Sequence, residues 1–134
     1  MSLFVDTNVW SLALRRDGPA TSAHVGALKQ ALEEGQTVLA TGIVLQELLQ
    51  GFSGPKSRML ILEHFSAIPL LVPDRDDHIE AAALRNHCRR KGVQTGSIDA
   101  LIAQLCIRHT LTLLSAGRDF KNIARHTDLK IWGI

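Results

Sequence analysis

Residues 3–10, which read LFVDTNVW, predict a short buried strand that ends at a carboxylate. Leu3, Phe4 and Val5 form an apolar run without alternating polar residues, a pattern typical of a strand covered on both faces. The run stops at Asp6, which is therefore expected at the carboxyl end of the strand, where parallel sheets bind their ligands. Asp6 is the first candidate for a functional residue, although Asp6 or Asn8 can equally cap a helix that follows.

Further apolar runs and helical patterns alternate along the rest of the chain. The runs that predict strands lie at residues 37–40, 68–72, 111–114 and 129–132. The helical patterns lie at residues 22–34, from Thr41 to Gly51, after Pro55, from Asp74 or Asp76 to Gly92, from Ser97 onward and at residues 120–125. Such alternation predicts the α/β class, with a three-layer αβα domain around a central, mostly parallel sheet of about five strands.

Three of these helical patterns carry apolar stripes that are expected to face the core. The stripe of the first helix is Val25, Leu28 and Leu32. The stripe after Pro55 is Met59, Leu62 and Phe65. The stripe after Ser97 is Ile98, Leu101, Ile102, Leu105 and Cys106.

Length and composition favour one ordinary globular domain over residues 1–134. The chain is 46% hydrophobic, and 15 Lys and Arg against 13 Asp and Glu give a net charge of +2. This mild positive charge is compatible with a nucleic-acid partner without being evidence for one. No apolar run reaches the roughly 18–20 residues that span a bilayer, and the first residues lack the basic region of a signal peptide. Cys88 and Cys106 form no CxxC pair, so we expect reduced thiols and a cytoplasmic protein.

Three further acids stand at positions where functional and structural explanations compete. Glu47 lies on a mostly apolar helix, where its charge needs a partner or a metal, unless it sits at the solvent rim of that helix. Asp99 falls in the first turn of the Ser97 helix, where it would complement the helix dipole by about 0.3–1 kcal/mol. Asp119 follows the fourth strand and can alternatively be the N-cap of the helix at residues 120–125.

Together the four acids predict a metal site. If the first and fourth strands are neighbours, Asp6, Asp99 and Asp119 converge at one edge of the sheet, and Glu47 joins them from the helix after the second strand. Carboxylates in one crevice repel each other unless a cation holds them, and ligation by oxygen alone suits Mg²⁺ or Mn²⁺. Such ions favour attack on phosphate esters.

These acids lie in four motifs that resemble those of PIN-domain ribonucleases, and most of all the VapC-type toxins of bacterial toxin–antitoxin pairs. The motifs are VDTNVW at residues 5–10, LQELLQG at 45–51, DALIA at 99–103, and LLS at 113–115 followed by DF at 119–120. They occur in order over nearly the whole chain. The resemblance implies a PIN fold and a Mg²⁺- or Mn²⁺-dependent endoribonuclease that leaves 5′-phosphate and 3′-hydroxyl ends. It also implies a homodimer and an antitoxin partner, similar to VapB, that blocks the site.

The same interpretation assigns roles to particular residues. The primary metal ligands are expected to be Asp6 and Asp99. The secondary or water-mediated ligands are expected to be Glu47 and Asp119, and one of the four acids would help to deprotonate the attacking water. Supporting side chains are expected at Asn8 and Ser115. Contacts with RNA phosphates are expected from Arg85, Arg89 and Arg118, although charge at a helix end also complements the helix dipole.

One departure from the family pattern keeps other functions open. Many relatives have Thr-x-Asp-x-Asp-Phe at the fourth motif, whereas residues 115–120 read SAGRDF, so Gly117 replaces the first acid and Asp119 keeps the second. The loss removes a ligand for a second metal ion, and it leaves a non-catalytic PIN scaffold that binds RNA or protein as an alternative. A phosphoaspartyl phosphatase or receiver domain is a weaker alternative, because the Asp-x-Asp or acidic pair that these proteins need is absent after the first strand.

Overall fold

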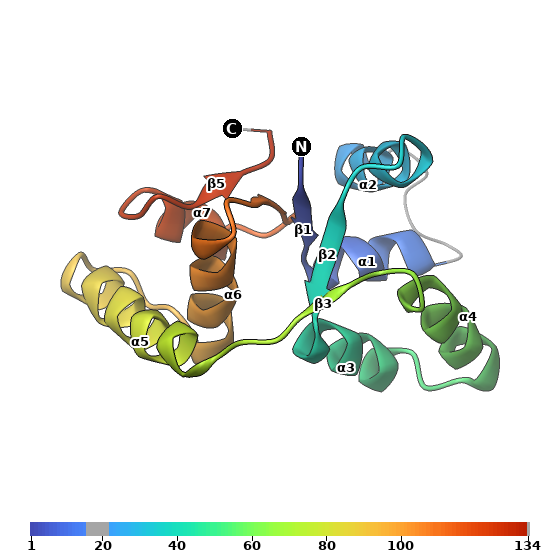
Figure 1. Ribbon diagram of the computed structural model, residues 1–134, viewed down its shortest axis with the longest axis horizontal. Coiled ribbons are helices and arrows are strands. Elements are labelled where there is room, and N and C mark those ends of the chain that lie inside the picture. Colours follow the sequence, from blue (N-terminus) through green and yellow to red (C-terminus); the bar gives the residue numbers. More distant parts are fainter. Residues whose placement is uncertain (16–21, 134) are drawn as a thin grey trace. The chain divides into compact units, whose positions relative to one another are not determined.

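The computed structural model describes residues 1–15 and 22–133 of the chain (Figure 1). The strands are β1 (Leu3–Val5), β2 (Val38–Thr41), β3 (Leu70–Leu71), β4 (Thr112–Leu114) and β5 (Lys130–Ile131). The helices are α1 (Thr7–Leu14), α2 (Ala23–Glu33), α3 (Gly42–Gly51), α4 (Pro55–Phe65), α5 (Arg75–Arg90), α6 (Ser97–Arg108) and α7 (Asp119–Ala124). Within the described residues, no helix is long and apolar enough to cross a membrane.

The strands form a five-stranded sheet in the order β3-β2-β1-β4-β5. Strand β1 pairs in parallel with β2, with Leu3 opposite Val38, and β2 pairs in parallel with β3. Strand β4 pairs in parallel with β5, with Leu113 opposite Ile131. The predicted α/β class, with a parallel sheet of about five strands, is therefore confirmed. The expected neighbourhood of the first and fourth strands is also confirmed, because they are adjacent in this order.

The chain divides into two compact units. The first comprises Met1–Val72 together with Leu114–Ala116, and the second comprises Pro73–Leu113 and Gly117–Ile134. In the first unit, β1 is buried along its whole length, as the apolar run at residues 3–5 predicts. Trp10 of α1 is 3% exposed, and its ring lies 4.9 Å, centroid to centroid, from the ring of Phe65 in α4. These buried residues belong to the core of the first unit.

In the second unit, α5 packs along α6 (Figure 1). Polar contacts join the beginning of α5 to the end of α6. Asp74 caps α5 in a reciprocal capping box with Asp77. Arg108, the last residue of α6, places Nη1 2.7 Å from Asp77 Oδ2 and 3.1 Å from Asp74 Oδ2. Burial alone would raise the pKa of Asp77. The hydrogen bond from the Asp74 amide and the hydrogen bond and positive charge of Arg108 lower the pKa by more, so it lies below its ordinary value.

Helix ends follow the local signals that the sequence contains. The Thr41 side chain accepts a hydrogen bond from the Val44 amide and caps α3, as expected. Gly35 and Gly92 adopt φ values of +69° and +82° after α2 and α5, a conformation that glycine adopts without steric cost. Cys88 and Cys106 are buried on α5 and α6, and neither forms a disulfide within the described residues.

The predicted face of α4 is wrong, whereas the predicted stripes of α2 and α6 are each wrong at one residue. In α4 the buried residues are Ile61 and Phe65, one helical turn apart, while Met59 is 71% exposed and Leu62 42% exposed. The expected stripe of Met59, Leu62 and Phe65 thus mixes two faces, because the apolar residues of α4 surround the helix and their spacing does not select one side. In α6, Ile98 lies outside the core at 44% exposed, and in α2 Leu32 is 42% exposed.

Candidate active site

Asp6 joins the end of β1 to the beginning of α1. It is the N-cap of α1, and its Oδ1 accepts a hydrogen bond of 2.8 Å from the Thr7 amide. Its Oδ2 accepts a second hydrogen bond, of 3.0 Å, from Ser115 Oγ. The Asp6 amide donates to the Leu114 carbonyl oxygen at 3.0 Å, which fixes the backbone at this point. Asp6 therefore is a helix cap, and it also presents a half-buried carboxylate at the carboxyl end of a central strand.

Asn8 and Ser115 extend this arrangement. Asn8 Nδ2 donates to Ser115 Oγ at 3.2 Å, and the Ala116 amide donates to Asn8 Oδ1 at 3.1 Å. Ser115 is 2% exposed and follows directly after β4. Because the Ser115 oxygen accepts from Asn8, its hydroxyl proton is directed to Asp6. Both side chains expected to support the acids thus lie in one hydrogen-bonded chain that ends at the Asp6 carboxylate.

Glu47 lies on α3 and faces the same residues. Its side chain is half-buried, and its Oε1 accepts a hydrogen bond of 3.0 Å from Thr7 Oγ1, a residue 40 positions away in the sequence. Glu47 thus has a polar partner on α1, and its role as a metal ligand stays a prediction. Thr7 donates to two carboxylates, through its amide to Asp6 and through its hydroxyl to Glu47.

The surroundings of Asp6 disfavour its charged form. Burial is the largest influence and raises the pKa of Asp6, and the nearby Glu47 charge raises it further. The hydrogen bonds from Thr7 and Ser115 lower it, but they do not compensate, so the pKa of Asp6 lies above its ordinary value of 3.8. A site that disfavours its own negative charge binds a proton or a cation readily.

The other two predicted acids belong to the second unit. Asp99 is half-buried in the first turn of α6, whose N-cap, Gly96, has no side-chain hydrogen bond to offer. Asp119 is exposed and is the first residue of α7, and Arg118 occupies the N-cap position. The alternative that Asp119 caps this helix is therefore wrong. The convergence of all four acids stays a prediction.

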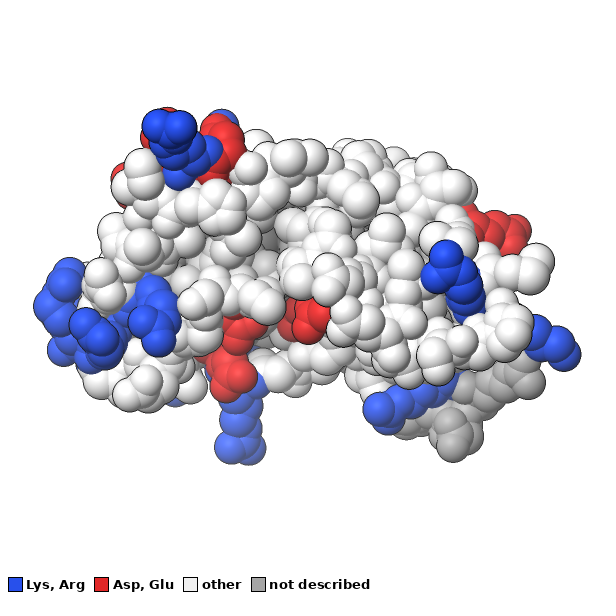
Figure 2. All heavy atoms as spheres, turned by 90° about the horizontal axis from the view of Figure 1, so that it is seen from below, with Lys and Arg blue, Asp and Glu red and all other residues white. Residues whose placement is uncertain are grey.

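The predicted basic contacts lie in the second unit as well. Arg85 Nε donates to the Thr95 carbonyl oxygen at 2.7 Å, which anchors this half-buried guanidinium. Arg89 is exposed in the last turn of α5, and Arg118 is exposed before α7. Figure 2 shows that several Lys and Arg side chains, in blue, extend from the face drawn. Their contact with RNA phosphates stays a prediction.

The donor chemistry of Asp6 and Glu47 fits a hard divalent cation. Among the described residues, no group of three or more His, Cys, Asp or Glu side chains is placed to hold a metal ion. Mg²⁺ commonly binds through one or two carboxylates and completes its coordination with water and substrate phosphates. The carboxylates of Asp6 and Glu47, which both accept hydrogen bonds from Thr7, provide ligands of this kind.

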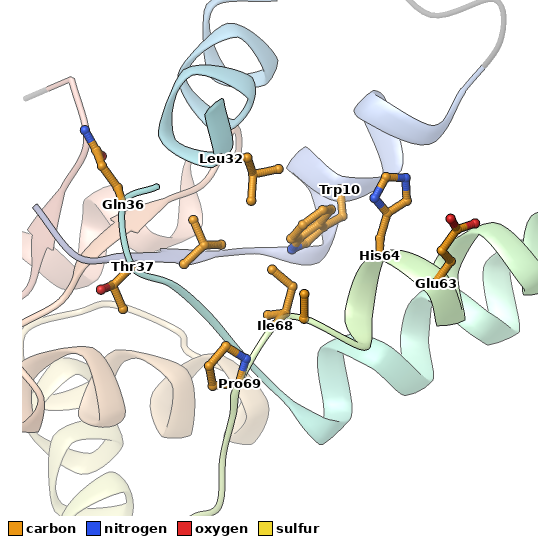
Figure 3. Close-up of a pocket in the computed structure, with 10 residues that line it drawn as sticks. Trp10, Leu32, Gln36, Thr37, Glu63, His64, Ile68 and Pro69 are labelled. Carbon is orange, nitrogen blue, oxygen red and sulfur yellow. The ribbon is translucent and has the colours of Figure 1, made fainter. Parts of the chain in front are cut away.

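Two cavities lie outside the acidic pair. The first, of about 580 Å³ in the first unit, is lined by Trp10, Leu32, Gln36, Thr37, Val38, Glu63, His64, Ala67, Ile68 and Pro69 (Figure 3). The Trp10 indole nitrogen has no hydrogen-bond partner within the described residues and points toward the space between Leu32 and Ile68 (Figure 3). The second, of about 440 Å³, lies in the second unit between α5 and α6 and includes Arg85. None of the predicted acids lines either cavity.

Comparison with known proteins decides the family. The PIN domain family matches residues 3–126, a range that contains all four acids. The chain belongs to the PIN-domain family. The α/β, three-layer PIN-like fold and the resemblance identified in the sequence are thereby confirmed.

Curated relatives of this PIN domain are named as VapC ribonucleases. It is 30% identical over 130 residues to VapC ribonuclease Mb1587 from Mycobacterium bovis and to ribonuclease VapC11 from Mycobacterium tuberculosis. The alignment covers 96% of this chain and 96% of each relative. Relatives of this PIN domain are thus nucleases.

Solved structures share the fold at low sequence identity. VapBC2 from Rickettsia felis, bound to a DNA fragment from its promoter, has a TM-score of 0.74 at 22% identity, covering 98% of this chain and 97% of that one. VapBC-1 from nontypeable Haemophilus influenzae has a TM-score of 0.74 at 18% identity, covering 98% and 96%. At these identities the likeness concerns the fold alone.

Sequence reasoning missed Thr7 as a member of the site. Thr7 lies within the VDTNVW motif, directly after the acid that ends the first strand, but no role was assigned to its hydroxyl. Its partner, Glu47, is 40 positions away, so the contact depends on the packing of α1 against α3.

Proposed function

We propose that this PIN domain is a metal-dependent endoribonuclease that acts as the toxin of a toxin–antitoxin pair. The observation that carries the proposal is the Asp6–Glu47 pair, which Thr7 holds at the carboxyl end of β1 in a chain 30% identical to VapC ribonucleases. The substrate is RNA, the partner is an antitoxin similar to VapB, and the active form is a cytoplasmic homodimer. Residues 1–134 work as one PIN domain.

The proposed cofactor is Mg²⁺ or Mn²⁺. Asp6 and Glu47 would hold it from the first unit, and Asp99 and Asp119 are the proposed ligands from the second. When bound, such an ion stabilises negative charge on the phosphate and lowers the pKa of the attacking water. Since Gly117 provides no carboxylate at the fourth motif, we favour one tightly held ion over two.

The residues of the first unit have separate tasks. The Thr7 amide and the Ser115 hydroxyl fix both oxygens of Asp6, and Asn8 directs the Ser115 hydroxyl toward it. Thr7 also fixes one oxygen of Glu47. One of the four acids would accept a proton from the attacking water. The proposed phosphate contacts are Arg85, Arg89 and Arg118.

Expression in bacteria tests the biological part of this proposal. Inducing the wild-type chain alone should arrest growth, and Asp6→Ala should remove the effect because it removes a central carboxylate. Asp128→Ala is the matched control, because Asp128 is an exposed acid near β5. Co-expression of a small protein encoded beside the gene should restore growth. Equal toxicity of the wild type and Asp6→Ala would contradict a catalytic toxin and favour a scaffold that acts by binding.

A further inference from the structure

We propose that Thr7 is a positioning residue, which holds the Asp6 and Glu47 carboxylates together so that they bind a divalent cation as a pair. This inference rests on the proposed function, because it concerns the same metal site. It assigns a role to the residue whose two donors reach both acids: the amide at 2.8 Å from Asp6 Oδ1 and the hydroxyl at 3.0 Å from Glu47 Oε1.

The position of Thr7 explains how one residue reaches both acids. Thr7 is the first residue of α1, where the amide has no partner within the helix and is available to the capping carboxylate of Asp6. Its side chain faces α3, which packs against α1 and carries Glu47. A hydroxyl has one proton, and the contact with Glu47 uses it. The contact occupies one of the two carboxylate oxygens of Glu47.

Holding the two acids together requires a donor between them. Two carboxylates that lie close repel each other, and a glutamate has enough rotatable bonds to turn away toward solvent. A hydrogen bond from Thr7 restricts Glu47 to the side on which Asp6 lies. Hydrogen-bond partners of metal-binding carboxylates have this effect in other proteins, where their mutation costs about 10–100-fold in metal affinity or activity.

A purely structural role for Thr7 makes a different prediction. The hydroxyl contact joins α1 to α3, so its loss could lower stability without any effect on the cation. Thr7→Val separates the two roles, because valine keeps the branched shape and loses the donor. Thr7→Ser keeps the donor and loses only a methyl group. Thr112→Val is the matched control, because it removes a threonine hydroxyl from strand β4, where valine is well suited.

The test is a calorimetric titration of the full-length, RNA-free protein with Mn²⁺. We expect Thr7→Val to raise the Kd for Mn²⁺ by about 10–100-fold. Thr7→Ser and Thr112→Val should bind like the wild type. Cooperative thermal unfolding of each variant in EDTA shows that the chain is folded.

Each other outcome overturns a specific statement. If Thr7→Val binds Mn²⁺ as tightly as the wild type while Asp6→Ala does not, the positioning role is wrong and the metal site stands. If Thr7→Ser loses as much affinity as Thr7→Val, the hydroxyl is not the cause and the inference is wrong. If the wild type binds no Mn²⁺, the proposed metal site is wrong, and the role of Thr7 is wrong with it.

Discussion

Replacing Asp6 by asparagine should stabilise the metal-free protein and remove most of its response to metal. Asparagine keeps an Oδ1 acceptor for the Thr7 amide, so the cap of α1 is retained. It loses the acceptor for the Ser115 hydroxyl, which costs about 1 kcal/mol. It also removes a buried charge next to Glu47. The pKa of Asp6 is raised although both hydrogen bonds are present, so burial and the nearby Glu47 charge destabilise the ionised carboxylate by more than the hydrogen bonds stabilise it. Removing the charge should therefore stabilise the protein by more than the lost hydrogen bond destabilises it.

The effect has a defined pH dependence. Because the folded pKa of Asp6 lies above its ordinary value of 3.8, the contribution of Asp6 to stability is fully present below that pH and is lost as the pH rises through the folded pKa. The asparagine variant has no such loss. The stability difference should therefore be small in acid and should favour the variant at neutral pH.

The response to metal provides the larger signal. At a metal concentration of about 100 Kd, binding stabilises the folded wild type by about 2.7 kcal/mol. An unfolding entropy of about 2.1 cal/mol/K per residue converts this value, for 134 residues, to a rise in Tm of roughly 10 °C. A variant that binds about 100-fold more weakly gains only about 0.4 kcal/mol, or roughly 1–2 °C.

Thermal unfolding of the wild type and Asp6→Asn, in EDTA and in saturating Mn²⁺, measures both effects. Asp128→Asn is the control, since it removes one negative charge from an exposed position. A variant that melts below the wild type in EDTA at neutral pH, and gains as much from Mn²⁺, would refute the reasoning about Asp6.

Two further predictions concern the second unit. Asp99→Asn should reduce the rise in Tm with Mn²⁺, whereas an Asp99 that only complements the α6 dipole would leave that rise unchanged. Arg108→Gln should lower the Tm at neutral pH, because Asp77 is 1% exposed and would lose its ion pair. The pKa of Asp77 is lowered, so the stability that its charge contributes is present above the ordinary value of 3.8 and is lost in acid. The decrease in Tm caused by Arg108→Gln should therefore become smaller as the pH falls. A decrease that does not depend on pH would exclude the loss of the Asp77 ion pair as its cause.

Local signals predicted the parts of the fold that depend on neighbouring residues. Three apolar residues followed by Asp6 indicated a buried strand that ends at a polar position, because both properties are encoded in consecutive residues. Thr41 and Asp74 stand at predicted helix starts, and each side chain accepts a hydrogen bond from the amide three positions ahead. The order of strands and helices then indicated a parallel sheet.

The errors occurred where local signals were ambiguous or contacts were distant. In α4, apolar residues surround the helix, so the buried face depends on what packs against it. The prediction that Met59 faces the core is therefore wrong. The start of α7 was missed by one residue, because Arg118 rather than Asp119 takes the cap position. The contact of Thr7 with Glu47 depends on how α1 meets α3, which no local pattern contains.

The most direct test of the central claim is cleavage of RNA by the purified chain with and without a divalent cation. Wild-type protein should cleave a labelled RNA in Mg²⁺ or Mn²⁺, lose that activity in EDTA and regain it when metal is restored. Asp6→Ala, purified in the same way, should be inactive under every condition. Full wild-type activity in EDTA, or equal activity of Asp6→Ala in Mn²⁺, would contradict a nuclease whose carboxylates hold a metal ion.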